Sequence, residues 1–141
     1  MVLVDSSVWI EASRRTGSLE IKVSLEALLE EYEAVLCSPV RLEVLGGARR
    51  QDRAALESYF GCLPYVCVQE KDYHLAAQNA WNLSDRGLQV PWNDLLIATI
   101  AQRLGCRVFA QDKHFEAMAG ALGLRLYRSG YGGQYNPGTG G

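Results

Sequence analysis

Short, almost wholly apolar segments alternate along this chain with longer segments whose apolar residues repeat at helical spacing. Continuous apolar segments are typical of strands that are buried on both faces of a parallel sheet. We expect strands at residues 2–4, 34–37, 65–68, 108–109 and 124–126. We expect helices at residues 7–15, 19–32, from 38 onward, 71–84, 93–104 and 113–122, and an amphipathic helix carrying Leu56, Tyr59, Phe60 and Leu63. This order predicts an α/β fold, with a central and mostly parallel sheet of four to five short strands flanked by helices.

The length and charge of the chain limit its organisation and its partners. With 141 residues it fits one domain, which we place at 1–128, followed by a Gly-rich tail at 129–141 that we expect to be flexible. The net charge of −2 provides no overall basic field, so any contact with nucleic acid has to be local. Neither a secretory leader nor an apolar run of membrane-spanning length is evident, and we expect a soluble, cytoplasmic protein with no membrane partner.

Four arginines, Arg41, Arg49, Arg50 and Arg53, lie close together in the sequence. Guanidinium groups bind phosphate through two parallel hydrogen bonds, so this cluster is a candidate local RNA contact. A solvated helix face explains the same cluster equally well.

The four cysteines show no pair or histidine neighbour at the spacing of a zinc site. Free cysteine is among the residues most often buried, so we interpret Cys37, Cys62, Cys67 and Cys106 as reduced thiols in the core.

Four carboxylates stand where short apolar segments meet helices: Asp5, Glu43, Asp94 and Asp112. In open α/β folds, ligands bind at the carboxyl ends of the strands. Asp94 begins a segment that is apolar on nearly every face, so its charge is costly without a partner. Taken singly, each acid has a simpler explanation. A strand-end aspartate often caps a helix, and Asn93 and Asp94 suit a cap and a first turn.

Acids that converge raise one another's pKa, and such a site stays ionised near neutral pH only if a cation neutralises it. All-oxygen ligands favour Mg²⁺ or Mn²⁺, which suits hydrolysis of a phosphodiester by metal-activated water. Ser7 follows Asp5 by two residues, where its hydroxyl can orient a carboxylate.

Four segments in the same order resemble PIN-domain proteins, in particular the VapC-type toxins of toxin–antitoxin pairs. They read VDSSVWI at 4–10, VRLEVLGG at 40–47, VPWNDLLIA at 90–98 and FAQDKHF at 109–115. The resemblance extends to about Tyr127 and implies a three-layer PIN-like sandwich.

By this resemblance, Asp5, Glu43, Asp94 and Asp112 are the catalytic acids, with Asp5, Asp94 and Asp112 as metal ligands. The resemblance further implies an endoribonuclease that uses Mg²⁺ or Mn²⁺, forms a homodimer and is silenced by a VapB-like antitoxin. One position departs from the family: a Thr or Ser is common two residues before the last acid, and here that residue is Ala110. Asn93 is a candidate to supply a polar group in its place.

Other residues near the acids have simpler interpretations. We interpret His114 as a surface histidine at a helix start, and Trp9, Trp81 and Trp92 as core or interface residues. Trp92, beside Asn93 and Asp94, is the one tryptophan that we regard as a possible RNA contact.

Two other classes of protein compete with a nuclease. A non-catalytic PIN-like module that binds RNA or protein is the main alternative, and the intact set of four acids argues against it. An aspartyl-phosphate phosphatase or receiver domain would need a second acid close to Asp5. Val4, Ser6 and Ser7 occupy those positions and disfavour it.

Overall fold

Four short strands form one parallel sheet in the computed structural model, which describes residues 1–129. The strands are β1 (Val2–Val4), β2 (Ala34–Cys37), β3 (Tyr65–Val66) and β4 (Arg107–Phe109), in the order β3-β2-β1-β4. In the register of the sheet, Val2 pairs with Ala34 on one side and with Arg107 on the other. Because all four strands run in the same direction, their carboxyl ends meet at one edge of the sheet.

Every residue of β1 and β2 is buried. Strands covered on both faces have no solvent-facing side, so their side chains show no alternation of apolar and polar residues. The expected α/β fold with a parallel sheet is confirmed.

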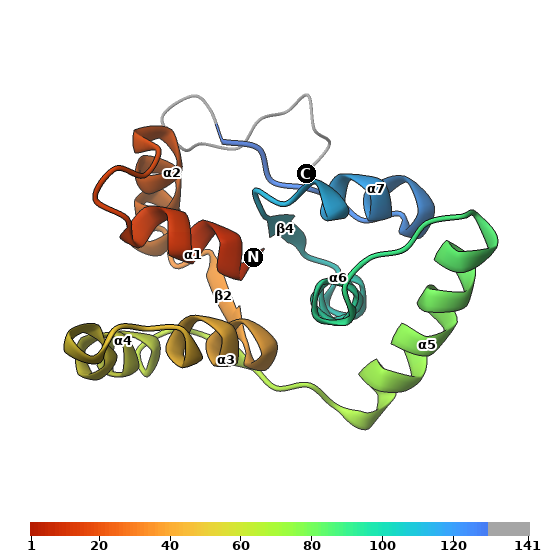
Figure 1. Ribbon diagram of the computed structural model, residues 1–141, viewed down its shortest axis with the longest axis horizontal. Coiled ribbons are helices and arrows are strands. Elements are labelled where there is room, and N and C mark those ends of the chain that lie inside the picture. The colour runs from red at the N-terminus through yellow and green to blue at the C-terminus, as the bar shows by residue number, and fades with distance from the viewer. Residues whose placement is uncertain (130–141) are drawn as a thin grey trace.

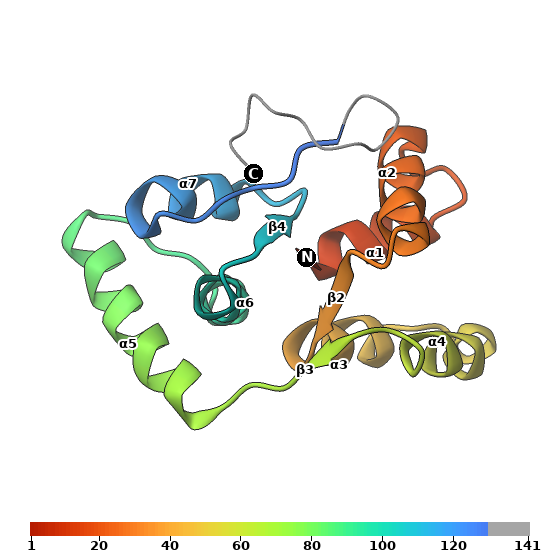
Figure 2. The same cartoon turned by 180° about the vertical axis from the view of Figure 1, so that it is seen from behind.

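Seven α-helices and one short 3-10 helix accompany the sheet within the described residues. They are α1 (Ser6–Ser13), α2 (Leu19–Glu30), α3 (Ser38–Gly46), η1 (Arg50–Asp52), α4 (Arg53–Phe60), α5 (Glu70–Asp85), α6 (Trp92–Leu104) and α7 (Lys113–Leu122). Helices α1 and α2 pack together on one side of the sheet, and α5 and α6 pack together on the other (Figures 1 and 2). The sheet is therefore the central layer between helices.

Helix α6 brings an acid to the carboxyl edge of the sheet. Pro91 precedes its first turn, and most residues from Asp94 to Ala101 are buried, as expected for a central helix. The helix ends at Gly105, whose φ of 66° lies in the left-handed region that glycine adopts without strain. Asp94 consequently lies in the first turn of α6, close to the ends of the strands.

Two strand expectations differ from the structure. Residues 124–126 form a single parallel bridge, Val108 to Leu126, rather than a fifth strand. Strand β3 ends at Val66, two residues before the expected end, and the backbone N–H of Val68 beyond it donates to Ser38 Oγ at 2.9 Å. This contact joins the first residue of α3 to the loop after β3.

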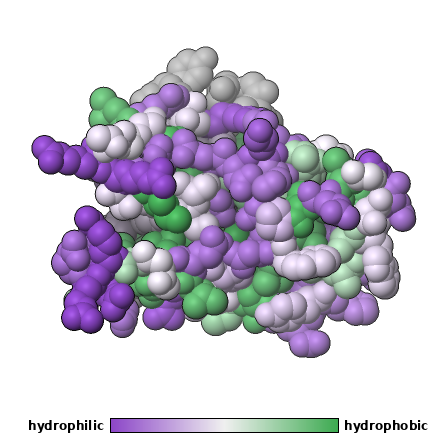
Figure 3. All heavy atoms as spheres, in the orientation of Figure 1, coloured by the Kyte–Doolittle hydropathy of each residue, from purple (hydrophilic) through white to green (hydrophobic). Residues whose placement is uncertain are grey.

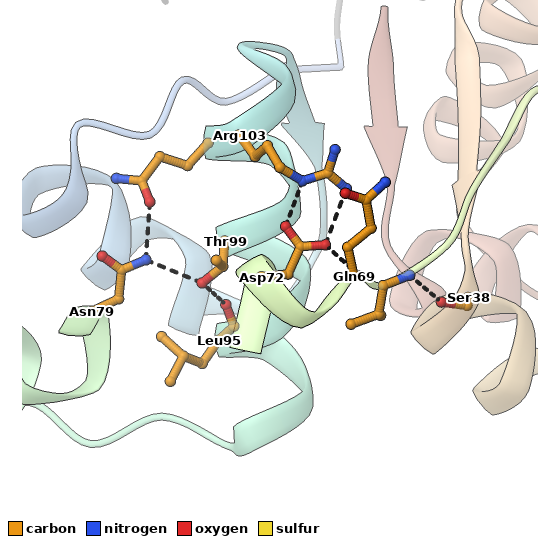
Figure 4. Close-up of polar contacts among 9 residues, drawn as sticks. Ser38, Gln69, Asp72, Asn79, Leu95, Thr99 and Arg103 are labelled. Atoms are coloured by element: carbon orange, nitrogen blue, oxygen red, sulfur yellow. Dashed lines mark hydrogen bonds and ion pairs between the residues drawn. The ribbon is translucent and has the colours of Figure 1, made fainter. Parts of the chain in front are cut away.

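Polar side chains fix α5 against α6 (Figure 4). Arg103 on α6 donates two hydrogen bonds, of 2.5 and 3.0 Å, to the fully buried carboxylate of Asp72 on α5. Asn79 of α5 donates to Thr99 Oγ1 at 3.1 Å and to Gln102 Oε1 at 2.9 Å. Although burial raises the pKa of Asp72, its hydrogen bonds hold that pKa below the ordinary value. These bonds set the position of α6, and with it that of Asp94.

The expectation of four buried thiols is half wrong. Cys37 and Cys106 are buried, whereas Cys62 and Cys67 are exposed. Cys62 follows α4 and Cys67 follows β3, the edge strand, so neither lies under a covering helix. Burial raises the pKa of the Cys37 thiol to about 12, which makes it unreactive.

The Gly-rich tail expected at 129–141 lies, from residue 130 onward, outside the described residues. Within residues 1–129, the structure contains no helix with the length and apolar character that crossing a membrane requires.

Candidate active site

Asp5 ends the central strand β1 and caps helix α1. Its Oδ2 accepts hydrogen bonds from the backbone N–H of Ser7 at 3.1 Å and from Ser7 Oγ at 2.6 Å. The Ser7 hydroxyl in turn accepts from the backbone N–H of Gln111 at 3.0 Å, which ties α1 to the loop after β4. Ser7 therefore orients the Asp5 carboxylate, as the sequence suggested.

The second oxygen of Asp5 has no such contact. Asp5 is 2% exposed, and its Oδ1 has no hydrogen-bond partner among the described residues. Burial raises the pKa of Asp5, while the Ser7 hydrogen bonds lower it and the nearby charge of Glu43 raises it. An ionised oxygen buried in this way is costly unless a ligand reaches it.

Asp94 approaches the same place from the first turn of α6 and is 9% exposed. Burial is the main factor that raises its pKa to about 6, and the charges of Asp5 and Asp112 raise it further. Asp94 is thus near enough to Asp5 and to Asp112 for both charges to influence its ionisation.

Asp112 caps helix α7, with Oδ1 accepting from the backbone N–H of His114 at 2.9 Å. Burial raises the pKa of Asp112, but the hydrogen bonds and charge of His114 outweigh it and leave the pKa lowered. The carboxylates of Asp94 and Asp112 and the ring of His114 offer ligand atoms that all lie within 4.8 Å of one another.

His114 is part of this cluster, which the sequence interpretation missed. Its Nδ1 lies 2.7 Å from Asp112 Oδ1 and 3.1 Å from Asp94 Oδ2. Partial burial lowers the pKa of His114, but the two carboxylates outweigh it and leave the pKa raised. One local signal existed: an acid at the N-cap brings the residue two positions later close to its own carboxylate.

Glu43 lies at the exposed rim of the cluster. Asn93 Nδ2 donates a hydrogen bond to Glu43 Oε1, which joins the first turn of α6 to α3. The simpler explanation of Asn93 as the cap of α6 does not hold, because the N-cap position belongs to Pro91 and carries no side-chain hydrogen bond. Asn93 instead holds the fourth acid next to the other three.

The candidate RNA contacts are all exposed. Arg41 lies over the ring of Tyr65, 5.5 Å from its centre, and Arg49 pairs with Asp52 at 3.1 Å. Trp92 is 78% exposed and immediately precedes Asn93. Trp92 and Trp81, which is 68% exposed, are thus not core residues, whereas Trp9 is buried.

A groove of about 880 Å³ adjoins the acids. Helices α1 to α4 line it, with apolar residues along it, arginines at its edge and Glu43 among the lining residues. The main apolar residues are Trp9, Leu25, Leu29, Leu56 and Tyr59, and the arginines are Arg14, Arg15 and Arg49.

The residues present fit a hard divalent cation. Asp5 Oδ1 lacks a hydrogen-bond partner within the described chain, and the charge of Asp5 acts on Asp94, whose ligand atom lies within 4.8 Å of those of Asp112 and His114. Carboxylate oxygen is the ligand that Mg²⁺ and Mn²⁺ prefer. Asp94, Asp112 and His114 have ligand atoms close enough together to share one ion, and the charge of Asp5 acts on Asp94 from nearby.

Comparison with known proteins yields relatives over almost the whole chain. The PIN domain family matches residues 2–121. The chain is 32% identical over 130 residues to "Ribonuclease VapC11" of Mycobacterium tuberculosis, covering 89% of this chain and 96% of that protein.

Solved structures share the fold at lower identity. VapBC2 from Rickettsia felis, bound to a DNA fragment from its promoter, is similar with a TM-score of 0.74 at 20% identity, covering 89% of this chain and 97% of the other. VapBC-5 from Mycobacterium tuberculosis, a member of the VapBC family of toxin–antitoxin systems, is similar with a TM-score of 0.62 at 23% identity, covering 89% and 96%. With a parallel sheet, four acids gathered at its carboxyl edge and a family match over residues 2–121, the chain belongs to the PIN-domain family, in its VapC branch.

Proposed function

We propose that this protein is a cytoplasmic endoribonuclease that depends on Mg²⁺ or Mn²⁺ and is the toxin of a toxin–antitoxin pair. The observation that carries the proposal is the cluster of Asp94, Asp112 and His114, with the buried Asp5, whose Oδ1 has no partner in the described chain, near enough for its charge to act on Asp94. A relative at 32% identity is named a ribonuclease, which supports RNA as the substrate.

Each acid has a part in this proposal. Asp5, Asp94 and Asp112 hold the metal, and a bound Mg²⁺ or Mn²⁺ would supply an acidic water and offset charge on the scissile phosphate. Ser7 keeps Asp5 Oδ2 occupied, so that Oδ1 stays directed to the site. Glu43, held by Asn93, completes the catalytic set at the rim. Cleavage then leaves a 5′-phosphate and a 3′-hydroxyl.

The RNA strand would contact exposed groups around the acids. Trp92 offers an exposed ring next to Asn93, on which an unpaired base can stack. Arg41, Arg49 and Arg50 are exposed cations on and after α3, suited to phosphate. Local contacts of this kind agree with a chain whose net charge is −2.

The partner in this proposal is a VapB-like antitoxin, and the toxin itself forms a homodimer. Apolar residues line much of the groove between α1 and α4, and Glu43 is among its lining residues, so an antitoxin segment seated in it would also contact Glu43. Arg49 and Tyr59 are among the residues that line this groove.

The test is to incubate antitoxin-free protein with total cellular RNA and map new 5′-phosphate ends by sequencing. Wild-type protein and an Asp94→Asn variant are compared with Mn²⁺ and with a chelator, after circular dichroism has shown that both are folded. We expect discrete ends only for wild-type protein with metal. Wild-type levels of cleavage by the variant would contradict the proposed roles. RNA binding without any cleavage would favour a non-catalytic module.

A further inference from the structure

A second cavity lies at the amino edge of the sheet, where β1 and β4 begin, opposite the edge that carries the acids. Its volume is about 280 Å³, which is at the small end of the range for ligand pockets and suits a small chemical group. We call it the amino-edge pocket. Its lining residues are Met1, Leu104, Gly105, Cys106, Arg107 and Arg125.

The two arginines of this pocket lie side by side in the register of the sheet. Val108 of β4 forms a parallel bridge with Leu126, and the backbone N–H of Val108 donates to the carbonyl of Arg125 at 2.9 Å. An arginine precedes each bridge partner, so Arg107 and Arg125 are neighbours across the two segments. Neighbours in a parallel register point to the same face.

The contacts of the next residues agree with this register. Phe109 and Tyr127 each follow a bridge partner, and their rings meet edge-on with centres 4.8 Å apart. The guanidinium carbon of Arg107 lies 5.4 Å from the centre of the Tyr127 ring. Arg107 is therefore on the face of Tyr127, which is also the face of Arg125 because side chains two residues apart in an extended segment share a face.

The lining of the amino-edge pocket is positive. No acidic side chain is among the lining residues that the structure describes. Glu33 lies nearby, but its Oε2 pairs with the α-ammonium of Met1 at 2.7 Å. The hydrogen bond to that ammonium is the main factor that lowers the pKa of Glu33, and the charge of Arg107 contributes least. Like charges that face each other on neighbouring strands destabilise a sheet, so an anion between the two arginines would relieve their repulsion.

Arg125 is exposed and is held at the pocket by one hydrogen bond. Its Nη2 donates to the carbonyl of Gly105, in the loop between α6 and β4. A guanidinium has several N–H donors in a fixed fork, so this bond orients Arg125 and leaves donors for a ligand. Burial raises the pKa of the buried Cys106 thiol, whereas the charges of the α-ammonium and of Arg125 lower it. The positive charge of Arg125 therefore acts inside the pocket.

A terminal phosphate group fits this lining. Guanidinium groups bind phosphate through two parallel hydrogen bonds. A phosphate monoester carries about two negative charges near neutral pH, enough to offset both arginines, whereas a carboxylate or a phosphodiester carries only one. The lining thus favours inorganic phosphate or a phosphate monoester.

The amino-edge pocket is separate from the arginines described above. In the space-filling view, strongly hydrophilic side chains gather over α1, α2 and α4, at the left of the molecule (Figure 3). Arg14, Arg15 and Arg49 line the groove there. The groove and the amino-edge pocket share no lining residue, so substitutions in one leave the other intact.

We propose that the amino-edge pocket binds a terminal phosphate group, either inorganic phosphate or a phosphate monoester, between Arg107 and Arg125. The inference does not depend on the proposed function, because it concerns the opposite edge of the sheet and needs neither a divalent metal nor cleavage.

The first test is isothermal titration calorimetry with inorganic phosphate, in buffer that contains a chelator and excess chloride. Wild-type protein should show saturable binding. Arg125→Gln should weaken it by about tenfold or more, because one of the two guanidiniums is lost. Arg86→Gln is the matched control, since Arg86 is also exposed and also makes one hydrogen bond, to Asn82 Oδ1 at 2.9 Å.

Arg125→Glu is a second variant that tests the pairing of the two arginines. Its carboxylate lies beside Arg107 in place of the anion, so phosphate binding should be lost. The variant should nevertheless be no less stable to urea than Arg125→Gln, because opposite charges then face each other. Circular dichroism checks that every variant is folded.

Nuclear magnetic resonance locates the site. On addition of phosphate to wild-type protein, the largest changes in backbone amide shifts should fall on residues 104–107 and on Arg125. Changes that fall only on residues of the groove would place the phosphate elsewhere and overturn the inference.

Three further ligands, again with chelator, distinguish the source of the phosphate: adenosine 5′-monophosphate, and one short RNA with either a 5′-phosphate or a 5′-hydroxyl. Tighter binding of the 5′-phosphate RNA, lost in Arg125→Gln, would identify an RNA end. Equal binding of the two RNAs, with Arg125-dependent binding of the monophosphate, would identify a small phosphate compound. Either result supports the site.

Two results would overturn the inference: no saturable binding of phosphate to wild-type protein, or equal affinities in wild-type protein and Arg125→Gln. Neither result bears on the proposed nuclease, whose metal-dependent cleavage of RNA is measured in its own assay.

Discussion

The Ser7 hydroxyl donates a 2.6 Å hydrogen bond to one oxygen of Asp5, and the other oxygen of Asp5 is buried without a partner in the described chain. One oxygen of the carboxylate is thereby held by Ser7, and the other is left without a hydrogen bond. Groups that orient a metal ligand in this way commonly contribute a factor of about 10–100 to metal affinity.

Ser7→Ala should accordingly weaken Mn²⁺ binding by about tenfold while the protein stays folded. Isothermal titration calorimetry of the antitoxin-free protein measures the affinity. Ser13→Ala is the matched control, because the Ser13 hydroxyl on the same helix bonds only to the backbone of Ile10. Equal Mn²⁺ affinities for Ser7→Ala and wild-type protein would show that Ser7 has no part in orienting Asp5.

Replacing Asp94 should change how stability depends on pH without metal. The pKa of Asp94 is raised to about 6 in the folded protein, so the folded state binds this proton more tightly than the unfolded state does. The stabilisation of the folded state by this bound proton is therefore greatest at low pH. It is lost as pH rises from about 4 to about 6. Asp94→Asn removes this loss and should be more stable than wild-type protein at pH 7, by roughly 1–3 kcal/mol.

Urea unfolding at several pH values with a chelator present measures that difference. The two proteins should converge in stability as pH falls below about 4, where Asp94 becomes protonated in the unfolded state as well as in the folded state. Parallel stability curves at all pH values would contradict the raised pKa.

His114→Ala should destabilise the metal-free protein more than the metal-loaded protein. The ring of His114 lies between Asp94 and Asp112, so its removal leaves two neighbouring carboxylates without their nearest cationic group. We expect a loss of about 1 kcal/mol with chelator, and a smaller loss with saturating Mn²⁺.

Thermal unfolding with and without Mn²⁺ checks this difference. His74→Ala, an exposed histidine on α5, serves as the control. If metal leaves the effect of His114→Ala unchanged, the ring acts through packing alone.

Asp72→Asn should cost about 3 kcal/mol of folding free energy, because it leaves the guanidinium of Arg103 without its charged partner. Asp72 is fully buried, whereas Asp85 at the other end of α5 is exposed, so Asp85→Asn should have little effect. Chemical denaturation measures both variants. Comparable stabilities for the two would mean that the Asp72–Arg103 pair does not hold α5 to α6.

Local patterns in the sequence predict much of this fold because they depend on neighbouring residues. Apolar runs predict the buried strands β1 and β2, and a continuous apolar segment predicts the central helix α6. Asp5 and Asp112 could be recognised in the sequence as candidate site residues because an acid that closely follows an apolar strand is a local pattern.

The tertiary structure decided the contacts between residues far apart in the chain. Ser7 meets the backbone of Gln111 across 104 positions, and Asn93 meets Glu43 across 50, so no local pattern records either pair. His114 looked like a surface residue because its partner Asp94 comes from another helix. The sequence by itself therefore determined most of the helices, the buried strands β1 and β2, and the choice of four acids as candidates for the site. The docking of α6 and α7 at the carboxyl edge of the sheet decided which side chains surround those acids, because packing brings together groups that the chain separates.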